Sequence, residues 1–326
     1  MRDIGIDLGT TNILIYVKGK GIVLNEPSVV AIDINSKKIV AVGKEAKEMI
    51  GRTPDKVEIV RPMKDGVIAD FDITEKMLSK LVKKALGKKI ISKPRILICC
   101  PSNITQVERN AIREMALRIG AKDVYIEEEP KVAAVGAGID IAKPSGSMVV
   151  DIGGGTTDIA VLSLGGIVTS NSIRVAGNTF DEDIINYIKE KYKVIIGEQT
   201  AEDLKLEIGT VADDKQEEKE ITGRSIDKGL PESITLNSKD IEEALKADLK
   251  RVVDAVKNVL EKTPPELCSD IKEKGIILTG GGSLINGLVD KLRKDLKIPV
   301  FISDNPLTNV VEGTGILLDN LHLVDN

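Results

Sequence analysis

The sequence contains few aromatic side chains and almost no imidazole. Its 326 residues include four Tyr, three Phe and no Trp, and the one histidine, His322, lies four places from the C-terminus. A Ser-His-Asp or Cys-His hydrolase, a His-ligated zinc enzyme and a histidine proton shuttle each need a well-placed imidazole. These chemistries are excluded, so any catalysis here has to depend on carboxylates, hydroxyls, backbone amides and a bound metal.

The scarcity of aromatic residues also argues against nucleic acid as a partner. Proteins that bind single strands stack bases on aromatic rings, and proteins that bind phosphate backbones present basic surfaces. This chain has a formal net charge of -5. We therefore expect no nucleic acid partner.

Cysteine is rare as well, and long hydrophobic runs are absent. Cys99, Cys100 and Cys268 are odd in number and include a vicinal pair, which favours a reduced cytoplasmic protein with three small buried thiols. Met1-Arg2-Asp3 leads directly into a strand pattern, so we expect no signal peptide. The longest uncharged stretch, Ile159 to Ile173, has 15 residues and is too short to span a bilayer.

Length and pattern indicate two α/β domains. Strand patterns fill the first 42 residues, and helical spacing follows at 73–86 and at 105–119, where Thr105 and Glu108 form a capping box. Residues 7–13 (DLGTTNI) are echoed 144 positions later by residues 151–159 (DIGGGTTDI), which indicates a duplicated domain. We predict domain I at 1–143 and domain II at 144–326. Further helices are expected at 180–192, 200–208, 238–263 and 284–296, and residues 211–232 are expected to be an irregular, charged surface segment.

The repeated Asp-x-Gly element is the most informative motif. A Gly-Thr or Gly-Gly-Gly-Thr-Thr turn between two strands exposes consecutive backbone N–H groups and hydroxyls, which a polyphosphate needs. Asp7 and Asp151 place a carboxylate beside each turn, where the pair can hold a hydrated Mg²⁺. The alternative is that both are ordinary glycine hairpins. Two copies in the same register favour a clamp on one nucleotide tail.

Other phosphate motifs fit this sequence less well. No G-x-x-x-x-G-K-[ST] segment is present, which excludes a P-loop. After Gly155 the chain runs TTDIAVL, a strand pattern instead of the helix that a dinucleotide fold requires. A third glycine cluster, residues 279–284 (TGGGSL), is expected to pass from strand to helix and to let the backbone approach a ligand at the helix N-terminus. Alone, such a cluster is more typical of a tight turn than of a ligand site, but beside two phosphate clamps it is expected to contact the nucleoside.

In this order, the three glycine motifs resemble those of the actin, Hsp70 and sugar-kinase superfamily, and residues 129–134 (EPKVAA) and 313–316 (GTGI) resemble its two connecting helices. Within it, residues 21–30 (GIVLNEPSVV), 65–70 (DGVIAD) and 263–267 (TPPEL) are similar to the MreB/Mbl family of bacterial actin homologues. The segments 97–101 (LICCP) and 127–129 (EEE) favour the Mbl branch. The resemblance covers essentially the whole chain and implies a duplicated actin-like, ribonuclease H-like ATPase fold. Each domain then has a smaller peripheral subdomain, near 32–75 and 183–245, and a C-terminal helix near 306–318 packs back towards domain I.

The resemblance also implies roles for individual residues, with ATP and Mg²⁺ as cofactors. Asp7 and Asp151 support the metal, Glu129 and Thr156 orient the water that attacks the γ-phosphate, and the catalytic set is Glu129, Thr156 and Asp151. Positioning and charge neutralisation are what phosphoryl transfer requires. Phosphate and nucleoside contacts fall on Thr10, Thr11, Asn12, Gly153, Gly154, Gly155, Thr156, Glu202, Asp203, Leu204, Lys205, Gly280, Gly281, Gly282, Ser283 and Leu284.

Two of these assignments carry an open alternative. Glu202 and Lys205 match the purine and ribose contacts of the family, but residues one turn apart can also be an exposed helical charge pair. Thr11 departs from the family pattern, which has alanine there. Its hydroxyl beside the phosphates either alters the hydrolysis rate or has no effect.

A basic loop at residues 88–94 (KKIISKP) is a second candidate site. Basic flanks attract anionic lipid, and an exposed apolar pair, Ile90 and Ile91, inserts into it. The family is similar in binding membranes through such a loop. The alternative is a buried pair that caps the core.

The sequence thus predicts an ATP-binding, slowly ATP-hydrolysing cytoskeletal protein of the actin-like class. By resemblance it assembles with itself into filaments on the inner face of the cell membrane, where it contacts anionic lipid and the cell-wall elongation machinery and maintains rod shape. A small-molecule kinase with the same clamp is the alternative, although no sugar pocket or general base is identifiable. An Hsp70-like chaperone would need a further peptide-binding domain. A filament protein that binds nucleotide but barely hydrolyses it is the third possibility.

Overall fold

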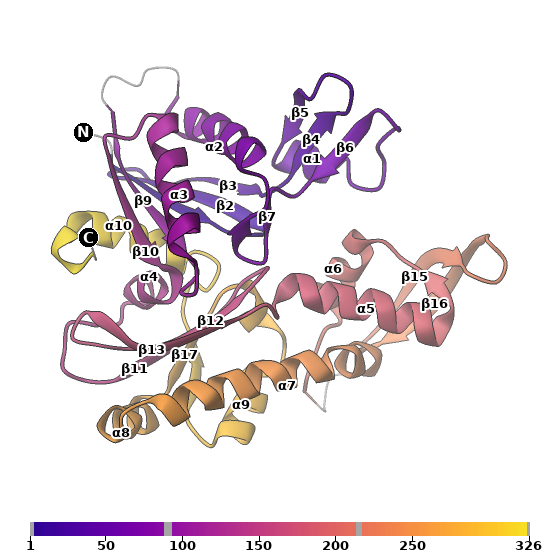
Figure 1. Ribbon diagram of the computed structural model, residues 1–326. Helices are drawn as coiled ribbons and strands as arrows, with labels where there is room; N and C mark the ends of the chain where they lie inside the picture. The colour runs from indigo at the N-terminus through magenta and orange to yellow at the C-terminus, as the bar shows by residue number, and fades with distance from the viewer. Residues whose placement is uncertain (1–2, 88–92, 213–216, 325–326) are drawn as a thin grey trace.

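Two five-stranded mixed sheets form the centre of the molecule (Figure 1). The computed structural model describes residues 3–87, 93–212 and 217–324. The first sheet has the order β10-β9-β1-β2-β3, and its strands are β1 (Ile4–Leu8), β2 (Asn12–Val17), β3 (Gly21–Pro27), β9 (Arg95–Cys100) and β10 (Asp123–Glu128). The second has the order β13-β12-β11-β17-β18, and its strands are β11 (Ser147–Ile152), β12 (Thr157–Ser163), β13 (Gly166–Ile173), β17 (Ile276–Thr279) and β18 (Val300–Ile302).

The two sheets have the same topology, as the repeated motif predicts. In each, three antiparallel strands form a meander, and the first of them pairs in parallel with a later strand that follows a helix. A second parallel strand completes each sheet. Parallel strands need crossover helices, and these are α2 (Phe71–Leu86), α3 (Gln106–Ile119), α7 (Ser238–Lys262) and α9 (Leu288–Leu296), joined in domain II by α5 (Gly177–Tyr192) and α8 (Pro265–Lys274).

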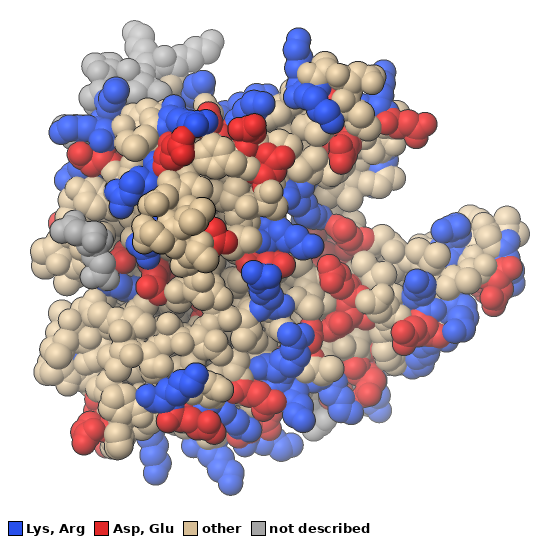
Figure 2. Space-filling model, viewed as in Figure 1, with Lys and Arg blue, Asp and Glu red and all other residues tan. Residues whose placement is uncertain are grey.

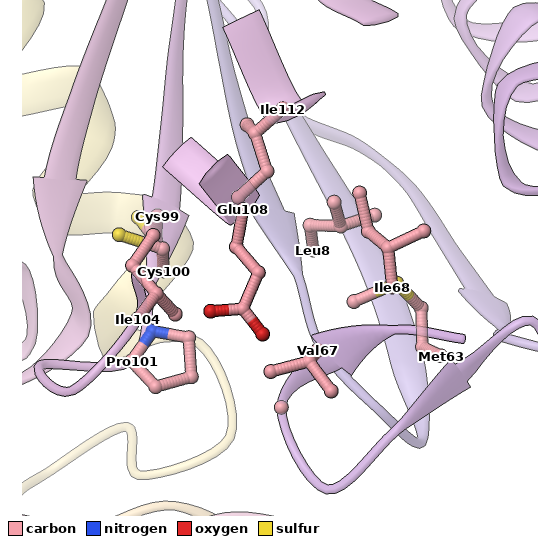
Figure 3. A pocket seen from close by; sticks show the side chains of 11 residues that line it. Leu8, Met63, Val67, Ile68, Cys99, Cys100, Pro101, Ile104, Glu108 and Ile112 are labelled. Atoms are coloured by element: carbon pink, nitrogen blue, oxygen red, sulfur yellow. The ribbon is translucent and has the colours of Figure 1, made fainter. Parts of the chain in front are cut away.

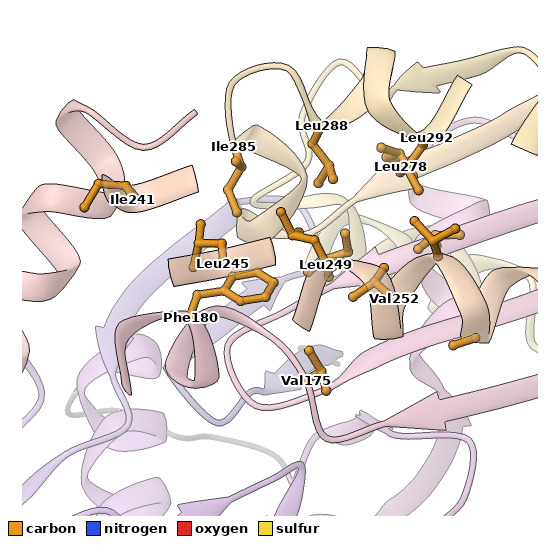
Figure 4. Packing of buried hydrophobic residues seen from close by; sticks show 14 of the residues in the cluster. Val175, Phe180, Ile241, Leu245, Leu249, Val252, Leu278, Ile285, Leu288 and Leu292 are labelled. Carbon is orange, nitrogen blue, oxygen red and sulfur yellow. The ribbon is translucent and has the colours of Figure 1, made fainter. Parts of the chain in front are cut away.

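Aliphatic residues fill both domain cores, since the chain has few aromatic side chains. Helix α7 carries Ile241, Leu245, Leu249 and Val252 on one buried face, and all four belong to the same buried cluster as Phe180 of α5, which lies beside Leu245 in Figure 4. Full burial of each such side chain stabilises the fold by about 1.5–3 kcal/mol. The helix begins where expected, with a capping box in which Asn237 and Asp240 bond each other's backbone N–H groups.

Each domain also carries a small peripheral sheet. In domain I this sheet is β5-β4-β6, with β4 (Val30–Asp33), β5 (Ile39–Val42), β6 (Val57–Val60) and the short helix α1 (Lys44–Lys47). In domain II it is β14 (Val194–Ile195), β15 (Glu218–Ser225) and β16 (Pro231–Asn237), with α6 (Glu198–Glu207) beside it. The two peripheral parts lie on the same side of the molecule and flank its open end (Figures 1 and 2). The division at residue 143 and the subdomain limits stay predictions.

Two helices cross between the domains. Helix α4 (Glu129–Gly136) follows the first sheet, and α10 (Asn309–Asp319) returns from the second to pack on β1. A Cβ on Gly136 would lie 1.8 Å from the Asn309 carbonyl oxygen, and one on Gly313 would lie 2.0 Å from the Val132 carbonyl oxygen. Only glycine permits this backbone contact, so these glycines set how closely the domains join.

Three local expectations were wrong. Residues 211–232 were expected to be irregular, but β15 lies there and pairs with β16 along its length, because alternating charged residues suit a strand exposed on one face. The helices expected at 180–192 and 200–208 begin earlier than predicted, α5 at Gly177 and α6 at Glu198. The helix expected from Leu284 begins at Leu288, after the 3₁₀ turn η1 (Gly281–Leu284).

The remaining elements are short, and the cysteines lie largely inside. A two-stranded hairpin, β7 (Met63–Lys64) with β8 (Val67–Ile68), lies between the peripheral sheet and α2, and η2 (Leu321–Leu323) follows α10. Cys99 and Cys100 are buried, and Cys268 is half-buried. No helix among residues 3–87, 93–212 and 217–324 is long and apolar enough to cross a membrane. Ile90 and Ile91 lie outside the described residues.

Candidate functional site

The first Asp-x-Gly motif forms the turn between β1 and β2. Asp7 is near the end of β1, and Thr10 and Thr11 occupy the turn. Ser28 supports it from the next connection, since its hydroxyl donates to the Gly9 carbonyl oxygen at 2.6 Å and its N–H donates to the Thr11 carbonyl oxygen at 2.8 Å. The turn is therefore held in place by two bonds from Ser28, as a ligand-binding turn needs to be.

The second motif forms the equivalent turn between β11 and β12. Its ends are joined by a bond from the Gly153 N–H to the Thr156 carbonyl oxygen, at 2.9 Å. The N-terminus of α5 packs on this turn, because the N–H groups of Gly177 and Asn178 donate to the carbonyl oxygens of Gly153 and Gly154. The second turn is thus tied to a helix of its own domain.

The two turns face each other across the domains. A Cβ on Gly154 would lie 1.7 Å from Oγ1 of Thr11, and one on Gly155 would lie 2.5 Å from Oγ1 of Thr10. The Thr11 hydroxyl also donates to Oδ1 of Asn178 at 3.2 Å. The duplicated motifs therefore meet, and glycine in the second motif is required for them to meet at this distance.

Four carboxylic acids gather behind the turns. Burial raises the pKa of Asp7 to about 7, and burial together with the charges of Asp158 and Asp7 raises the pKa of Asp151 well above its usual range. Burial, followed by the charges of Asp158, Asp7 and Asp151, raises the pKa of Glu129 in the same direction. Uncompensated buried carboxylates oppose ionisation until a cation neutralises them.

Asp158 was not assigned a role from the sequence. It is buried in β12 and accepts a bond from the Ser102 N–H at 3.3 Å. Burial raises the pKa of Asp158, and the polar groups of Thr156, Ser172 and Ser102 near it only partly offset this effect. Asp158 therefore lies beside Thr156, one of the predicted catalytic residues. The available signal was a lone aspartate inside the otherwise apolar strand Thr157–Ser163.

The third glycine cluster lies against the second motif. Gly280 has a φ of +79°, and a Cβ there would lie 2.3 Å from Oδ1 of Asp151. The Ser283 hydroxyl donates to the Gly280 carbonyl oxygen at 2.6 Å, while Leu284 is exposed. The expected helix N-terminus is absent at this position, since the glycines enter the 3₁₀ turn η1 and α9 begins only after Gly287. Close backbone approach, and not a helix dipole, is what this cluster offers.

Four consecutive residues of α6 were predicted to contact a nucleoside, and their side chains point in different directions. The Lys205 ammonium group donates to the Gly177 carbonyl oxygen at 2.9 Å and pairs with Asp181 at 2.7 Å, beside the second turn. Glu202 pairs with Lys47 of domain I at 2.8 Å, so it does not form the alternative helical pair with Lys205. Leu204 is fully buried in the domain II core, and Asp203 accepts a bond from Gln199 on the helix surface. The structure therefore brings Lys205 to the turns and leaves the side chains of Leu204 and Asp203 away from them.

An apolar pocket lies beside the carboxylate cluster in domain I (Figure 3). Leu8, Cys100 and Pro101 line it together with the β7–β8 hairpin. Glu108 is its one charged residue, and this carboxylate is engaged in the capping box of α3 at 2.6 and 2.7 Å. The pocket adjoins the first turn, since the N–H of its lining residue Gly66 donates to Oγ1 of Thr10 at 2.9 Å, but its lining is mostly apolar.

The two mixed sheets share one topology and are joined by crossing helices, and each carries a glycine turn at its inner edge. These features define an actin-like protein. The structure superposes on the crystal structure of MreB5 of Spiroplasma citri bound to AMPPNP with a TM-score of 0.95 and 41% identity, covering 98% of this chain and 97% of that chain. It also superposes on the MamK double helical filament with a TM-score of 0.84 at 23% identity, covering 98% of both chains, which shows the fold alone.

The sequence comparisons agree with the fold. The whole chain, residues 1–326, matches the family model described as MreB/Mbl protein. It is 60% identical to the cell shape-determining protein Mbl of Bacillus subtilis (98% of this chain, 96% of the relative). It is 51% identical to the cell shape-determining protein MreB of Escherichia coli K12 (99% and 94%). The chain belongs to the MreB/Mbl family, and its greater identity to Mbl agrees with the branch that its sequence favours.

Proposed function

We propose that the protein binds one ATP between the two glycine turns and hydrolyses it slowly. The proposal depends above all on the contact of Thr11 with Gly154 and of Thr10 with Gly155. Facing backbone N–H groups and hydroxyls supply donors from both domains to the same phosphates. The related MreB5 structures bound to AMPPNP and to ADP support this choice of ligand.

The carboxylate cluster fits a Mg²⁺ ion held largely through water. No group of three or more metal-ligating side chains occurs among the described residues, so direct coordination by the protein alone is unsuitable. Asp7 and Asp151 are nevertheless buried close enough for the charge of one to raise the pKa of the other. Mg²⁺ prefers one or two carboxylates, several waters and phosphate oxygens. When bound, the ion would neutralise the phosphates and this acidic pair.

Glu129 and Thr156 are suited to orient a water for attack. Glu129 begins α4, where the connecting helix leaves the first sheet, and burial followed by the charges of Asp158 and Asp7 raises its pKa. A carboxylate with a raised pKa accepts a proton more readily once it is ionised. The Thr156 hydroxyl lies close to the buried Asp158 carboxyl group. In this proposal both groups position a water molecule, and neither attacks the phosphate itself. The expected reaction is therefore slow hydrolysis, which serves as a switch.

We further propose that the protein polymerises into filaments on the inner face of the cell membrane and organises cell-wall synthesis in a rod-shaped cell. The names of the Mbl and MreB relatives, cell shape-determining proteins, support the cellular role. The filament formed by MamK, which shares the fold, supports self-assembly. Two further parts of the proposal come from the resemblance to the family. These are membrane attachment through Ile90 and Ile91 and contact with the cell-wall elongation machinery.

Sedimentation of the purified full chain tests this proposal. We expect ATP-dependent pelleting in Mg²⁺ buffer, and additional pelleting with anionic vesicles that is lost in an Ile90→Ser/Ile91→Ser variant. Neutral vesicles are the control for charge. Failure to pellet in every condition, combined with ATP consumption that a sugar stimulates, would instead identify a small-molecule kinase.

A further inference from the structure

Two ion pairs join the domains at the mouth of the space between their peripheral parts. The Lys47 ammonium group of α1 lies 2.8 Å from Oε2 of Glu202 on α6. Arg61, which follows β6, pairs with Glu198 on the same helix. In Figure 2, basic and acidic side chains lie close together where the peripheral part of domain I approaches the peripheral part of domain II below it. The sequence alone does not indicate either pair, since their members are 155 and 137 residues apart.

Both sides of this contact are anchored. On the domain I side, Ala46 buries α1 in the peripheral core, and the Lys44 N–H donates to Oε2 of Glu26 at 2.8 Å. On the domain II side, Ala201 and Leu204 of α6 are buried in the domain core. Glu198 and Glu202 are one helical turn apart and therefore share the face turned towards domain I. Neither helix has to be reorganised for the pairs to form.

Helix α6 also connects this contact to the second glycine turn. Lys205, three residues after Glu202, donates to the Gly177 carbonyl oxygen at 2.9 Å. The Gly177 N–H in turn donates to the Gly153 carbonyl oxygen at 3.1 Å. A continuous set of bonds thus runs from α1 of domain I, through α6, to the turn that faces Thr11.

We propose that Lys47 is a positioning residue of the nucleotide site. It holds the Glu202 carboxylate at the cleft mouth and keeps the domain I peripheral sheet closed over α6, which slows the release of a bound nucleotide. The inference is based on the proposed function, because it assigns Lys47 to the same site. It predicts that loss of one ammonium group far from the phosphates changes how long the nucleotide stays bound.

The size of the effect follows from exposure. The side chains of Lys47 and Glu202 are 34% and 27% exposed, whereas those of Arg61 and Glu198 are 39% and 59% exposed. Partly exposed pairs have modest coupling, so breaking the Lys47 pair is expected to speed release by about two- to fivefold. Breaking the Arg61 pair is expected to have a smaller effect. Salt weakens both pairs and reduces the difference between wild type and variant.

The test is the release rate of a fluorescent ATP analogue, chased with excess ATP at low salt. We expect faster release from Lys47→Ala, recovery in Lys47→Arg, and no change in Lys38→Ala, an exposed lysine of the same peripheral sheet. In a Glu202→Gln background, Lys47→Ala should have no further effect, because the pair is already broken. Recovery with arginine separates the positioning role from a general loss of stability.

Two failures are distinguishable. A wild-type chain that retains no nucleotide would overturn the proposed function and this inference with it. A wild-type chain that retains nucleotide, and releases it at the same rate as Lys47→Ala, would overturn this inference alone. A change that persists undiminished in the Glu202→Gln background would also overturn it, since Lys47 would then act through another group.

Discussion

Oγ1 of Thr11 lies where a Cβ on Gly154 would have to be, 1.7 Å from the ideal position of that atom. These residues belong to different domains and to the two copies of one repeated motif. Their contact means that the domains approach each other at the turns themselves. The spacing of the turns is therefore fixed by the absence of a side chain at Gly154.

Replacing Gly154 with alanine should separate the turns. The added methyl group forces a shift that costs about 1–3 kcal/mol, which corresponds to roughly 5- to 150-fold weaker ATP binding where the cost falls on the site. Fluorescence titration with an ATP analogue measures this. Gly166→Ala is the matched control, because its Cβ meets nothing within 4 Å. Equal affinities in the two variants would show that the turns do not share a ligand.

Thr11→Ala should affect stability and not hydrolysis. Its hydroxyl donates to Oδ1 of Asn178 at 3.2 Å, so it is engaged with domain II and not free to act on a water. Loss of one such bond costs about 0.5–1.5 kcal/mol, measurable as a lower Tm, and Thr11→Ser should restore it. An altered hydrolysis rate at unchanged Tm would instead favour a direct catalytic effect of this hydroxyl.

Glu129→Gln should separate binding from hydrolysis. The substitution keeps the size of the side chain and removes its ability to accept a proton, so phosphate release should fall by roughly 10²- to 10⁴-fold while nucleotide affinity persists. Phosphate release under single-turnover conditions is the measurement, with the adjacent Glu128→Gln as control. A variant that still turns over at the wild-type rate would remove Glu129 from its assigned role.

Asp183 on α5 should make stability depend on pH. Burial, followed by the neighbouring carboxyl group of Asp248 on α7, raises the pKa of Asp183 to about 7 from 3.8. The unfolded chain releases this proton first, so the contribution of the protonated pair is present below about pH 4 and is lost between pH 4 and about 7. Asp183→Asn should therefore have a higher Tm relative to wild type at pH 7.5 than at pH 5. A difference that is constant with pH would contradict the shared proton.

The repeated motif and the alternation of apolar residues were enough to predict the two sheets and the two turns that face each other. The DLGTTNI and DIGGGTTDI segments predicted two hairpins, and both form. Helix starts were less predictable, because the N-cap residues of α5 and α6, Ala176 and Gly197, have no side chain that could cap a helix and so leave no signal in the sequence. Strand β15 was missed because its exposed charges conceal the pattern of a half-buried strand.

The site was predictable in part for a physical reason. Phosphate-binding turns need glycine and hydroxyl residues in one short segment, so they leave a local motif. The Lys47–Glu202 pair and the bond between Thr11 and Asn178 join segments 155 and 167 residues apart, and no local pattern marks either. Asp158 was within the motif, but its role depends on burial and on the hydroxyls around it, which only the folded chain supplies.

Calorimetric titration of the nucleotide-free full chain with Mg-ATP is the most direct test of the central claim, that the two turns bind one nucleotide together. We predict one site per chain in the wild type, strong weakening in Gly154→Ala, and wild-type affinity in Gly166→Ala. Removal of Mg²⁺ should weaken binding in the wild type and much less in an Asp7→Asn/Asp151→Asn variant, where the acidic pair is gone. Binding with no dependence on Gly154 or on the two aspartates, or no binding at all, would contradict the account.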